Sequence, residues 1–348
     1  MEKSKVLIIG GTGYLGKRLV KASLAEGHET YILHRAEIGV DIDKVQMLLS
    51  FKEQGAHLVS GSFTDHQSLV KAIKLVDVVI CAISGVHIRS HQILLQLKLI
   101  DAIKDAGNVK RFLPSEFGTD PARMENALEP GRVTFDDKMI VRKAIEDAQI
   151  PFTYISANCF AGYFLGGLCQ PGKILPSRDS VVLLGDGNKK AIYVEEDDIA
   201  MYTIKTIDDP RTLNKTVYLR PPKNILSQRE VVEIWEKLIG KELQKSSIPK
   251  EQLLASLKGH QLGGLGSRSL TALTTGAVAL VTSANGPITE AVNSGLEYAE
   301  QVGLIHYYHV CYEGCLTDFE IGNDAVEASE LYPEIKYTTV EGYMKRYL

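Results

Sequence analysis

The 348-residue sequence lacks a long apolar run and lacks an excess of charge of one sign. No apolar stretch is long enough to span a bilayer, so we expect no membrane segment and no membrane partner. The 39 basic and 43 acidic residues give a net charge of −4 and mix along the chain, which indicates no nucleic-acid partner. The apolar run near the start is only a few residues long and leads into glycines, so no signal peptide is expected.

Cysteine is scarce and shows no Cys-x-x-Cys spacing. An odd number of scattered cysteines is typical of reduced thiols, so we expect a cytoplasmic protein without disulfides. His87 and His91, like His306 and His309, come without the further ligands that a zinc site requires, and no metal site is predicted. The five cysteines are Cys81, Cys159, Cys169, Cys311 and Cys315.

A glycine-rich turn between an apolar run and a helical pattern is the strongest signal that is present. The run Val6–Ile9 predicts a buried strand, and apolar positions from Leu19 onward predict a helix. Between them lie Gly10, Gly13 and Gly16. A dinucleotide pyrophosphate lies close to the backbone at such a helix N-terminus, and side chains at these positions would block the turn, the phosphate and the helix–strand packing respectively. The segment therefore predicts a dinucleotide site.

The end of the next predicted strand indicates which dinucleotide binds. The strand at residues 29–33 is followed by His34 and Arg35. An NAD site usually carries Asp or Glu there, to accept from the ribose 2′-hydroxyl, whereas a guanidinium forms a forked pair with a 2′-phosphate. We therefore expect NADPH as the cofactor, with Arg35 at its 2′-phosphate.

Strand and helix patterns alternate through the first half of the chain. Such alternation predicts an α/β fold with a Rossmann-like, doubly wound parallel sheet. We expect residues 1–157 to form the NADP-binding domain, with a return segment near 190–220. The predicted strands are 6–9, 30–33, 57–60, 76–81, 111–114, 152–156 and 216–219, and the predicted helices lie near 15–26, 44–54, 66–74, 90–106 and 136–148.

After residue 157 the pattern loosens, and residues 158–348 are expected to form mainly a smaller α/β substrate-binding domain. Gly185-Asp-Gly187 is typical of a hairpin turn. Acidic residues at 195–198 favour the start of a helix, and Ser227 with Glu230 predicts a capping box for a helix over 228–240.

Residues 259–294 form an atypical segment, with Arg268 and Glu290 as its only charged residues. Ala, Gly, Thr and Ser dominate it, and its apolar part is too short to span a membrane. A long flap, a helix packed on the substrate domain and an insertion without function all stay open.

Beyond the glycine turn, five stretches stand out: SGVHIRSH at 84–91, NVKRFLPSEFG at 108–118, ANCFAGYF at 157–164, DDPRTLNK at 208–215 and YPEIKYTT at 332–339. In these motifs, and from residues 5 to 258 and 296 to 348 overall, the chain resembles the plant pinoresinol–lariciresinol reductases. That family belongs with the isoflavone reductases and the phenylcoumaran benzylic ether reductases. Since the family lacks a counterpart of 259–294, the resemblance implies that this segment is an insertion.

The resemblance implies that Lys138 is the general base. Ordinary short-chain dehydrogenases use Tyr-x-x-x-Lys after the fifth strand, but that spacing occurs here only at Tyr332 to Lys336, far from the expected helix. Instead, Lys138 begins the helix after the fifth strand, where the family places its catalytic lysine. Desolvation in a partly apolar pocket would lower the lysine pKa toward working pH. On residues alone, a solvated first-turn lysine is the alternative.

The implied reaction opens the furan rings of lignans. Removal of the phenolic proton would expel the benzylic ether oxygen and leave a quinone methide, to which a hydride from NADPH adds. Pinoresinol would give lariciresinol, and a second round would give secoisolariciresinol.

The resemblance also assigns contacts to the cofactor and the substrate. Without the resemblance, Asn158, Cys159 and Phe160 after the sixth strand could equally belong to a hydrophobic core, and His306 could be a satisfied core or surface histidine. The expected cofactor contacts are Thr12, Tyr14 and Leu15 at the pyrophosphate, Ser84 and Gly85 at the ribose, and Asn158, Cys159 and Phe160 at the nicotinamide, and the expected substrate contacts are Tyr163, Phe164 and His306.

Two alternative functions stay open. One keeps the cofactor and Lys138 but changes the substrate to an isoflavone, a phenylcoumaran or a phenylpropenyl ester. The other is a non-catalytic NADP-sensing regulator of the same fold, against which the presence of Lys138 argues. The resemblance further implies a homodimer, with the helix near 90–106 as a plausible contact.

Overall fold

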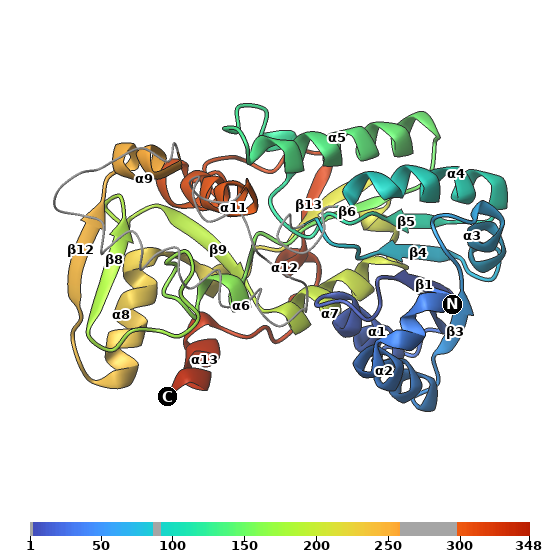
Figure 1. The fold of residues 1–348 in the computed structure, drawn as a ribbon, viewed down its shortest axis with the longest axis horizontal. Helices are drawn as coiled ribbons and strands as arrows, with labels where there is room; N and C mark the ends of the chain where they lie inside the picture. The colour runs from blue at the N-terminus through green and yellow to red at the C-terminus, as the bar shows by residue number, and fades with distance from the viewer. Residues whose placement is uncertain (1–2, 86–91, 258–297) are drawn as a thin grey trace, which may run out of the picture.

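The computed structural model describes residues 3–85, 92–257 and 298–348, which form two lobes (Figure 1). Predictions that concern residues 86–91 and 258–297 lie outside the described residues. These predictions include the one that His87 and His91 form no metal site and those on the nature of the segment 259–294.

A parallel sheet forms the first lobe, on the right of Figure 1. Five strands pair in the order β3-β2-β1-β4-β5, and a parallel bridge between Phe112 and Phe152 continues the sheet to a parallel set of order β6-β10-β13. The carboxyl ends of all these strands share one edge, where doubly wound sheets bind their ligands. The strands are β1 (Val6–Ile9), β2 (Thr30–His34), β3 (His57–Ser60), β4 (Val78–Cys81), β5 (Arg111–Leu113), β6 (Thr153–Ser156), β10 (Lys215–Tyr218) and β13 (Ala325–Glu327).

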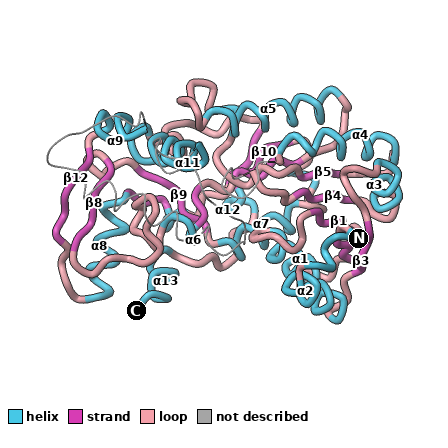
Figure 2. The backbone as a smooth tube through the Cα atoms, viewed as in Figure 1, coloured by secondary structure: helices cyan, strands magenta, loops and turns pink. Residues whose placement is uncertain are grey.

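Alternating side chains of β1 explain why helices cover both faces of the sheet (Figure 2). Val6 and Ile8 pack in a cluster with residues of α1 (Gly16–Ala25) and α2 (Ile42–Glu53). Leu7 and Ile9 pack in a second cluster with residues of the helices on the other face. All four side chains are buried because a parallel strand between two helical layers exposes neither face. The helices of the other face are α3 (His66–Ile73), α4 (Gln96–Ala106) and α5 (Arg132–Asp147).

Two small sheets and their helices build the second lobe. β7 (Cys159–Phe160), β9 (Lys190–Val194) and β11 (Ile225–Ser227) form one sheet, and β8 (Ser180–Leu184) pairs in parallel with β12 (Gln244–Ile248). The helix α7 (Glu196–Thr206) packs on α1 and thereby links the lobes. The remaining helices are α6 (Ala161–Phe164), α8 (Gln228–Ile239), α9 (Lys250–Leu257), α11 (Tyr298–Tyr308), α12 (Ala328–Leu331) and α13 (Val340–Met344).

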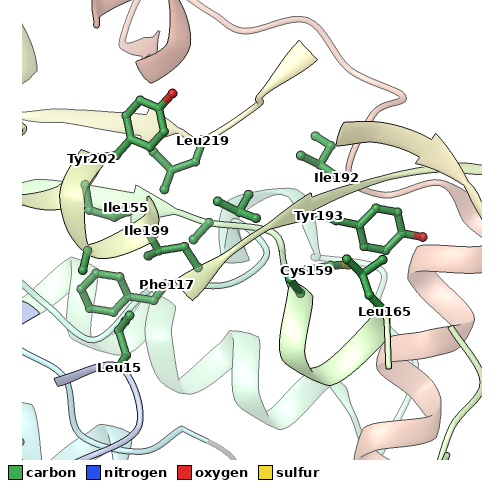
Figure 3. Close-up of a cluster of buried hydrophobic side chains, with 14 of the residues drawn as sticks. Leu15, Phe117, Ile155, Cys159, Leu165, Ile192, Tyr193, Ile199, Tyr202 and Leu219 are labelled. Carbon is green, nitrogen blue, oxygen red and sulfur yellow. The ribbon is translucent and has the colours of Figure 1, made fainter. Parts of the chain in front are cut away.

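One apolar cluster continues from the first lobe into the second (Figure 3). Leu15 from the glycine-rich turn and Phe117 from the loop after β5 lie at one end. Cys159 and Tyr193 of the second lobe lie at the other. The edge of the sheet that carries the candidate site is therefore packed directly against the second lobe.

The predicted α/β fold with a parallel sheet is confirmed, and the predicted strands of the first half are present with small shifts at their ends. Two helices differ in where they begin. α4 starts at Gln96, after a short 3₁₀ turn, and α5 already starts at Arg132. Lys138 therefore lies in the second turn of α5 and not in its first. The capping box of Ser227 and Glu230 is present at the start of α8.

Two details of the second half differ from the prediction. Gly185 to Gly187 connects β8 and β9, but the two strands belong to different sheets, so the predicted hairpin is wrong. Instead, β8 pairs with β12, and β9 lies between β11 and β7. In addition, β13 returns to the main sheet beside β10, so the C-terminal part contributes to both lobes.

Among the described helices, none combines the length and the apolar character needed to cross a bilayer.

Candidate functional site

The glycine-rich turn lies at the carboxyl end of β1 and leads into α1. Gly10 has a φ of +82°, which favours glycine. A Cβ on Gly16 would lie 1.9 Å from the carbonyl oxygen of Gly10, so a side chain would push the start of α1 off the turn. The N–H of Gly13 donates to the Gly10 carbonyl at 2.8 Å and closes the turn. The result is a bare backbone cradle at a helix N-terminus, which fits a dinucleotide pyrophosphate.

The three non-glycine residues of this turn, Thr12, Tyr14 and Leu15, differ in what they can offer a cofactor. Thr12 is half-buried, whereas the Leu15 side chain is buried between the lobes, so Leu15 presents only backbone (Figure 3). Tyr14 points toward the second lobe, where its ring centroid lies 5.6 Å from that of Tyr163 and its hydroxyl bonds to the Glu196 carboxylate. The Tyr14 side chain therefore ties the turn to α6 and α7.

Arg35 follows β2 directly, and its side chain is exposed. β2 runs parallel to β1, with Leu33 beside Ile9, so Arg35 lies at the same edge as the glycine-rich turn. Within the described ranges its guanidinium forms no ion pair. This placement leaves a positive charge available to an anionic group beside the turn.

Ser84 and Gly85 follow β4 at the same edge. The Ser84 carbonyl accepts from the Gln92 N–H at 3.2 Å, and a Cβ on Gly85 would lie 2.8 Å from the Ile93 side chain. The Ser115 hydroxyl, after β5, donates to the Ile83 carbonyl at 2.7 Å. The loops that follow these two neighbouring strands are thereby joined.

Lys138 is buried in the second turn of α5, with 7% of its surface exposed. Its Nζ donates to the Glu116 carbonyl at 2.8 Å. Burial lowers the pKa of Lys138, the nearby Arg142 guanidinium lowers it further, and the Glu116 and Asp120 carboxylates oppose both. An uncharged amine that donates one N–H to a carbonyl keeps its lone pair for an incoming proton. The alternative of a solvated first-turn lysine is wrong.

Arg142 lies one turn after Lys138 and holds two buried carboxylates. Its Nε and Nη2 donate to the two oxygens of Glu116 at 3.0 and 2.7 Å. Its Nη1 lies 2.9 Å from Oδ1 of Asp120, and the Tyr218 hydroxyl donates to the other oxygen of Asp120. These contacts fasten the loop after β5 to the face of α5 that carries Lys138.

Asn158, Cys159 and Phe160 follow β6 and lead into the second lobe. Asn158 has a φ of +57°, and its side-chain amide donates to the Leu219 carbonyl at 2.7 Å. Cys159 is buried in the core between the lobes, and this burial raises the pKa of its thiol (Figure 3). A cofactor contact from Cys159 would thus involve its backbone, whereas the Phe160 ring is only half-buried.

The predicted substrate residues lie on α6 and α11. The Tyr163 side chain is exposed, and its carbonyl accepts from the Tyr307 hydroxyl at 3.2 Å. Phe164 packs on the Tyr307 ring with centroids 4.7 Å apart. His306 packs on Phe135 of α5 with centroids 5.1 Å apart, and its Nε2 lies 3.3 Å from the Gly131 carbonyl oxygen. Phe135 precedes Lys138 by about one turn of α5, so His306 packs against the turn before Lys138.

Three residues were not singled out from the sequence, namely Glu116, Arg142 and Glu196. Arg142 follows Lys138 by four positions, the spacing that puts two side chains on one helix face, and Glu116 follows the carboxyl end of the fifth strand. These signals were available, but neither identifies a partner. In the part of the chain that the structure describes, no group of three His, Cys, Asp or Glu side chains is arranged to hold a metal ion, and the five cysteines are free thiols.

Comparisons with known proteins place this geometry in a family. Residues 2–344 match the model of the NmrA-like family. The chain is 71% identical over 347 residues to "Bifunctional pinoresinol-lariciresinol reductase 2" of Linum usitatissimum, covering 100% of this chain and 94% of that protein. It is 70% identical over 349 residues to "Bifunctional pinoresinol-lariciresinol reductase" of Forsythia intermedia, covering 100% of both chains.

Solved structures give the same result. The structure "AtPrR2 with NADP+ and (+)pinoresinol" superposes with a TM-score of 0.87 at 52% identity and covers 100% of both chains. "Crystal Structure of Isoflavone Reductase" superposes with a TM-score of 0.83 at 37% identity, again over 100% of both chains. The predicted resemblance, the predicted class of NADPH-dependent oxidoreductase and the predicted cofactor are confirmed. The chain belongs to the NmrA-like family, among its pinoresinol–lariciresinol reductases.

Proposed function

We propose that this chain opens the benzylic ether rings of lignans with NADPH, converting pinoresinol to lariciresinol and lariciresinol to secoisolariciresinol. The observation that carries the proposal is the buried amine of Lys138, whose Nζ donates to the Glu116 carbonyl beside the ligand edge of the sheet. The similarity of the chain to reductases named for these two substrates supports the choice of substrate.

In this proposal Lys138 is the general base. Because burial lowers its pKa, the neutral amine accepts the proton of the substrate's phenol. The phenolate electrons then move through the ring and break the benzylic carbon–oxygen bond. Because that bond is part of the furan ring, the step leaves one molecule that carries both a quinone methide and an alkoxide, and the alkoxide takes up a proton to become an alcohol. Bound NADPH supplies the hydride that adds to the benzylic carbon and restores the aromatic ring.

The remaining site residues bind and orient. The glycines at 10, 13 and 16 accept the pyrophosphate together with Thr12, Tyr14 and Leu15, and Arg35 pairs with the 2′-phosphate. The loops at 84–85 and 158–160 border the nicotinamide half. Tyr163, Phe164 and His306 face the substrate, with Tyr163 as the most accessible of the three predicted rings on α6 and α11.

The test is chiral chromatography of pinoresinol incubated with the protein and NADPH. We expect secoisolariciresinol from the wild type and no product from Lys138→Met, which keeps most of the aliphatic stem. Lys143→Met is the matched control, because Lys143 is exposed on the same helix and pairs only with Asp147 among the described residues. NADPH titration by fluorescence shows whether each variant still binds the cofactor.

Other outcomes decide between the alternatives. Product that stops at lariciresinol would mean that the second ring is not opened. NADPH oxidation with an isoflavone or a phenylcoumaran, but not with pinoresinol, would move the assignment to that substrate. Full turnover by Lys138→Met would contradict the role of this lysine.

We also infer a cytoplasmic homodimer from the family resemblance. Light scattering of the purified protein tests the dimer, and a fluorescent fusion in plant cells tests the location.

A further inference from the structure

Four ionisable side chains meet on the buried face of α5 and in the loop after β5. Lys138, Arg142, Glu116 and Asp120 each have less than a tenth of their surface exposed. Arg142 contacts both carboxylates, through the paired bonds to Glu116 and the 2.9 Å contact with Asp120. Two carboxylates thus face the Arg142 guanidinium and the amine of the proposed base.

The residue that Arg142 holds is also the residue that accepts from Lys138. The side chain of Glu116 bonds to Arg142, while its backbone carbonyl accepts the Lys138 Nζ at 2.8 Å. Since Lys138 and Arg142 are one turn apart on the same helix, both bonds lock the Glu116 peptide against α5. Removing one partner of a buried, hydrogen-bonded charged pair is costly, because the other charge then lacks a partner in the protein interior.

We propose that Arg142 is a positioning residue that holds the Glu116 carbonyl against the Lys138 amine and offsets the two carboxylates beside it. This inference rests on the proposed function, because it concerns the base of that reaction. Without the guanidinium, Glu116 would lose its paired bonds, and Asp120 would keep only the Tyr218 hydroxyl and Arg123 at 3.7 Å. The two carboxylates would then favour the protonated form of the amine.

The electrostatics of the site agree with this role. Burial is the largest cause of the lowered pKa of Lys138, Arg142 lowers it further, and the two carboxylates raise it. The groups packed around the cluster come from other elements of the described chain, and each contacts a residue other than Lys138. The ring of Tyr154 in β6 lies against the Arg142 guanidinium, and its hydroxyl donates to Glu146. Tyr218 of β10 donates to Asp120, and Arg123 donates to the Tyr218 hydroxyl and lies 3.7 Å from the Asp120 carboxylate. His306 of α11 packs on Phe135.

The experiment measures the titration of Lys138 directly. Protein labelled with ¹³C at the lysine Cε is titrated by NMR, and the signal of Lys138 is identified by its loss in Lys138→Arg. We expect Arg142→Met to raise the pKa of Lys138 by roughly one unit, and Glu116→Gln to lower it. Lys143→Met, which removes an exposed charge from the next position, should leave the titration unchanged.

Activity provides the second readout. A base must be uncharged, so the rate rises with pH through the pKa of Lys138. Arg142→Met should therefore move the rising limb of kcat/KM to higher pH and lower the rate about tenfold on that limb, while Glu116→Gln moves the limb to lower pH. Arg142→Lys, which keeps the charge but loses the fork, should keep the limb near its wild-type position.

The outcomes separate this inference from the proposed function. An unchanged Lys138 titration in both Arg142→Met and Glu116→Gln would overturn it, even if pinoresinol is reduced. The expected opposite shifts would uphold it, even if the substrate proves to be a different phenol. If Arg142→Met does not fold, Glu116→Gln decides alone, and a Lys138 pKa that rises or stays unchanged there would overturn the inference.

Discussion

The Glu196 carboxylate accepts a 2.8 Å hydrogen bond from the backbone N–H of Gly162, across the junction of the two lobes. It also bonds to the Tyr14 hydroxyl of the glycine-rich turn. Burial raises the pKa of Glu196. Burial also raises the pKa of Tyr14, and the negative charge of the Glu196 carboxylate raises it further. One carboxyl group therefore connects the cofactor turn to the first residues of α6, next to the predicted substrate ring of Tyr163.

Gly162→Ala tests this connection. A Cβ there would lie 2.5 Å from the Tyr14 hydroxyl and 2.8 Å from Oε1 of Glu196, so the ends of these two side chains have to move and the connection is disturbed. We expect the KM for NADPH to rise about tenfold and the free energy of unfolding to fall by about 1–3 kcal/mol. Gly303→Ala is the matched control, because a Cβ on Gly303 of α11 would meet nothing within 4 Å. Equal KM values for the two variants would contradict the role of the junction.

Gly16→Ala tests the cradle of the cofactor turn. Its Cβ would lie 1.9 Å from the Gly10 carbonyl oxygen, which is backbone and cannot move without opening the turn. We expect NADPH binding, measured by fluorescence titration, to weaken about 100-fold, the equivalent of about 3 kcal/mol. Gly39→Ala should bind normally, since a Cβ there meets nothing within 4 Å. Normal NADPH affinity in Gly16→Ala would show that the pyrophosphate binds elsewhere.

Arg35→Ala tests the choice between NADPH and NADH. Removing the exposed guanidinium should lower kcat/KM for NADPH by roughly 10- to 100-fold, in line with about 1.5–3 kcal/mol for a hydrogen bond to a charged group. The rate with NADH should change little, because NADH has no 2′-phosphate. Lys44→Ala removes a neighbouring exposed charge that pairs with Asp41 and serves as the control. A parallel loss with both cofactors would mean that Arg35 does not contact the 2′-phosphate.

Asp198→Asn tests a pH dependence of stability. Burial raises the pKa of Asp198 to about 6, although the Thr338 N–H donates to it at 2.7 Å. Between pH 4 and 6 the folded state therefore keeps a proton that the unfolded state loses, so this group lowers stability as pH rises through that window. The difference in unfolding free energy, variant minus wild type, should increase by roughly 3 kcal/mol from pH 4 to pH 7.

Urea unfolding at several pH values measures this difference. Asp197→Asn is the control, because Asp197 is the next residue, is exposed and pairs with Arg18. A difference between Asp198→Asn and wild type that stays constant from pH 4 to 7 would contradict the raised pKa.

The amino-acid sequence by itself determined the features that depend on short segments. The buried strand Val6–Ile9, the turn from Gly10 to Gly16 and the placement of Arg35 after the second strand all follow from local patterns, and the structure contains them. A glycine with positive φ, or a helix packed against the turn that precedes it, depends on residues that are close together in the sequence, so a local pattern predicts it. The capping box at Ser227 is local in the same way.

Only the tertiary structure decided which distant residues meet. Whether Lys138 is solvated or buried depends on the loop after β5, and the pairing of Arg142 with Glu116 joins residues 26 positions apart. The link from Tyr14 to Glu196 and the return of β13 to the main sheet span still longer separations. Such contacts arise because packing of the two lobes brings these segments together, and a pattern read along the chain carries no record of which segments pack. The chemistry of the residues was therefore visible in the sequence, whereas their environment, which sets their pKa values and their partners, was a property of the folded chain.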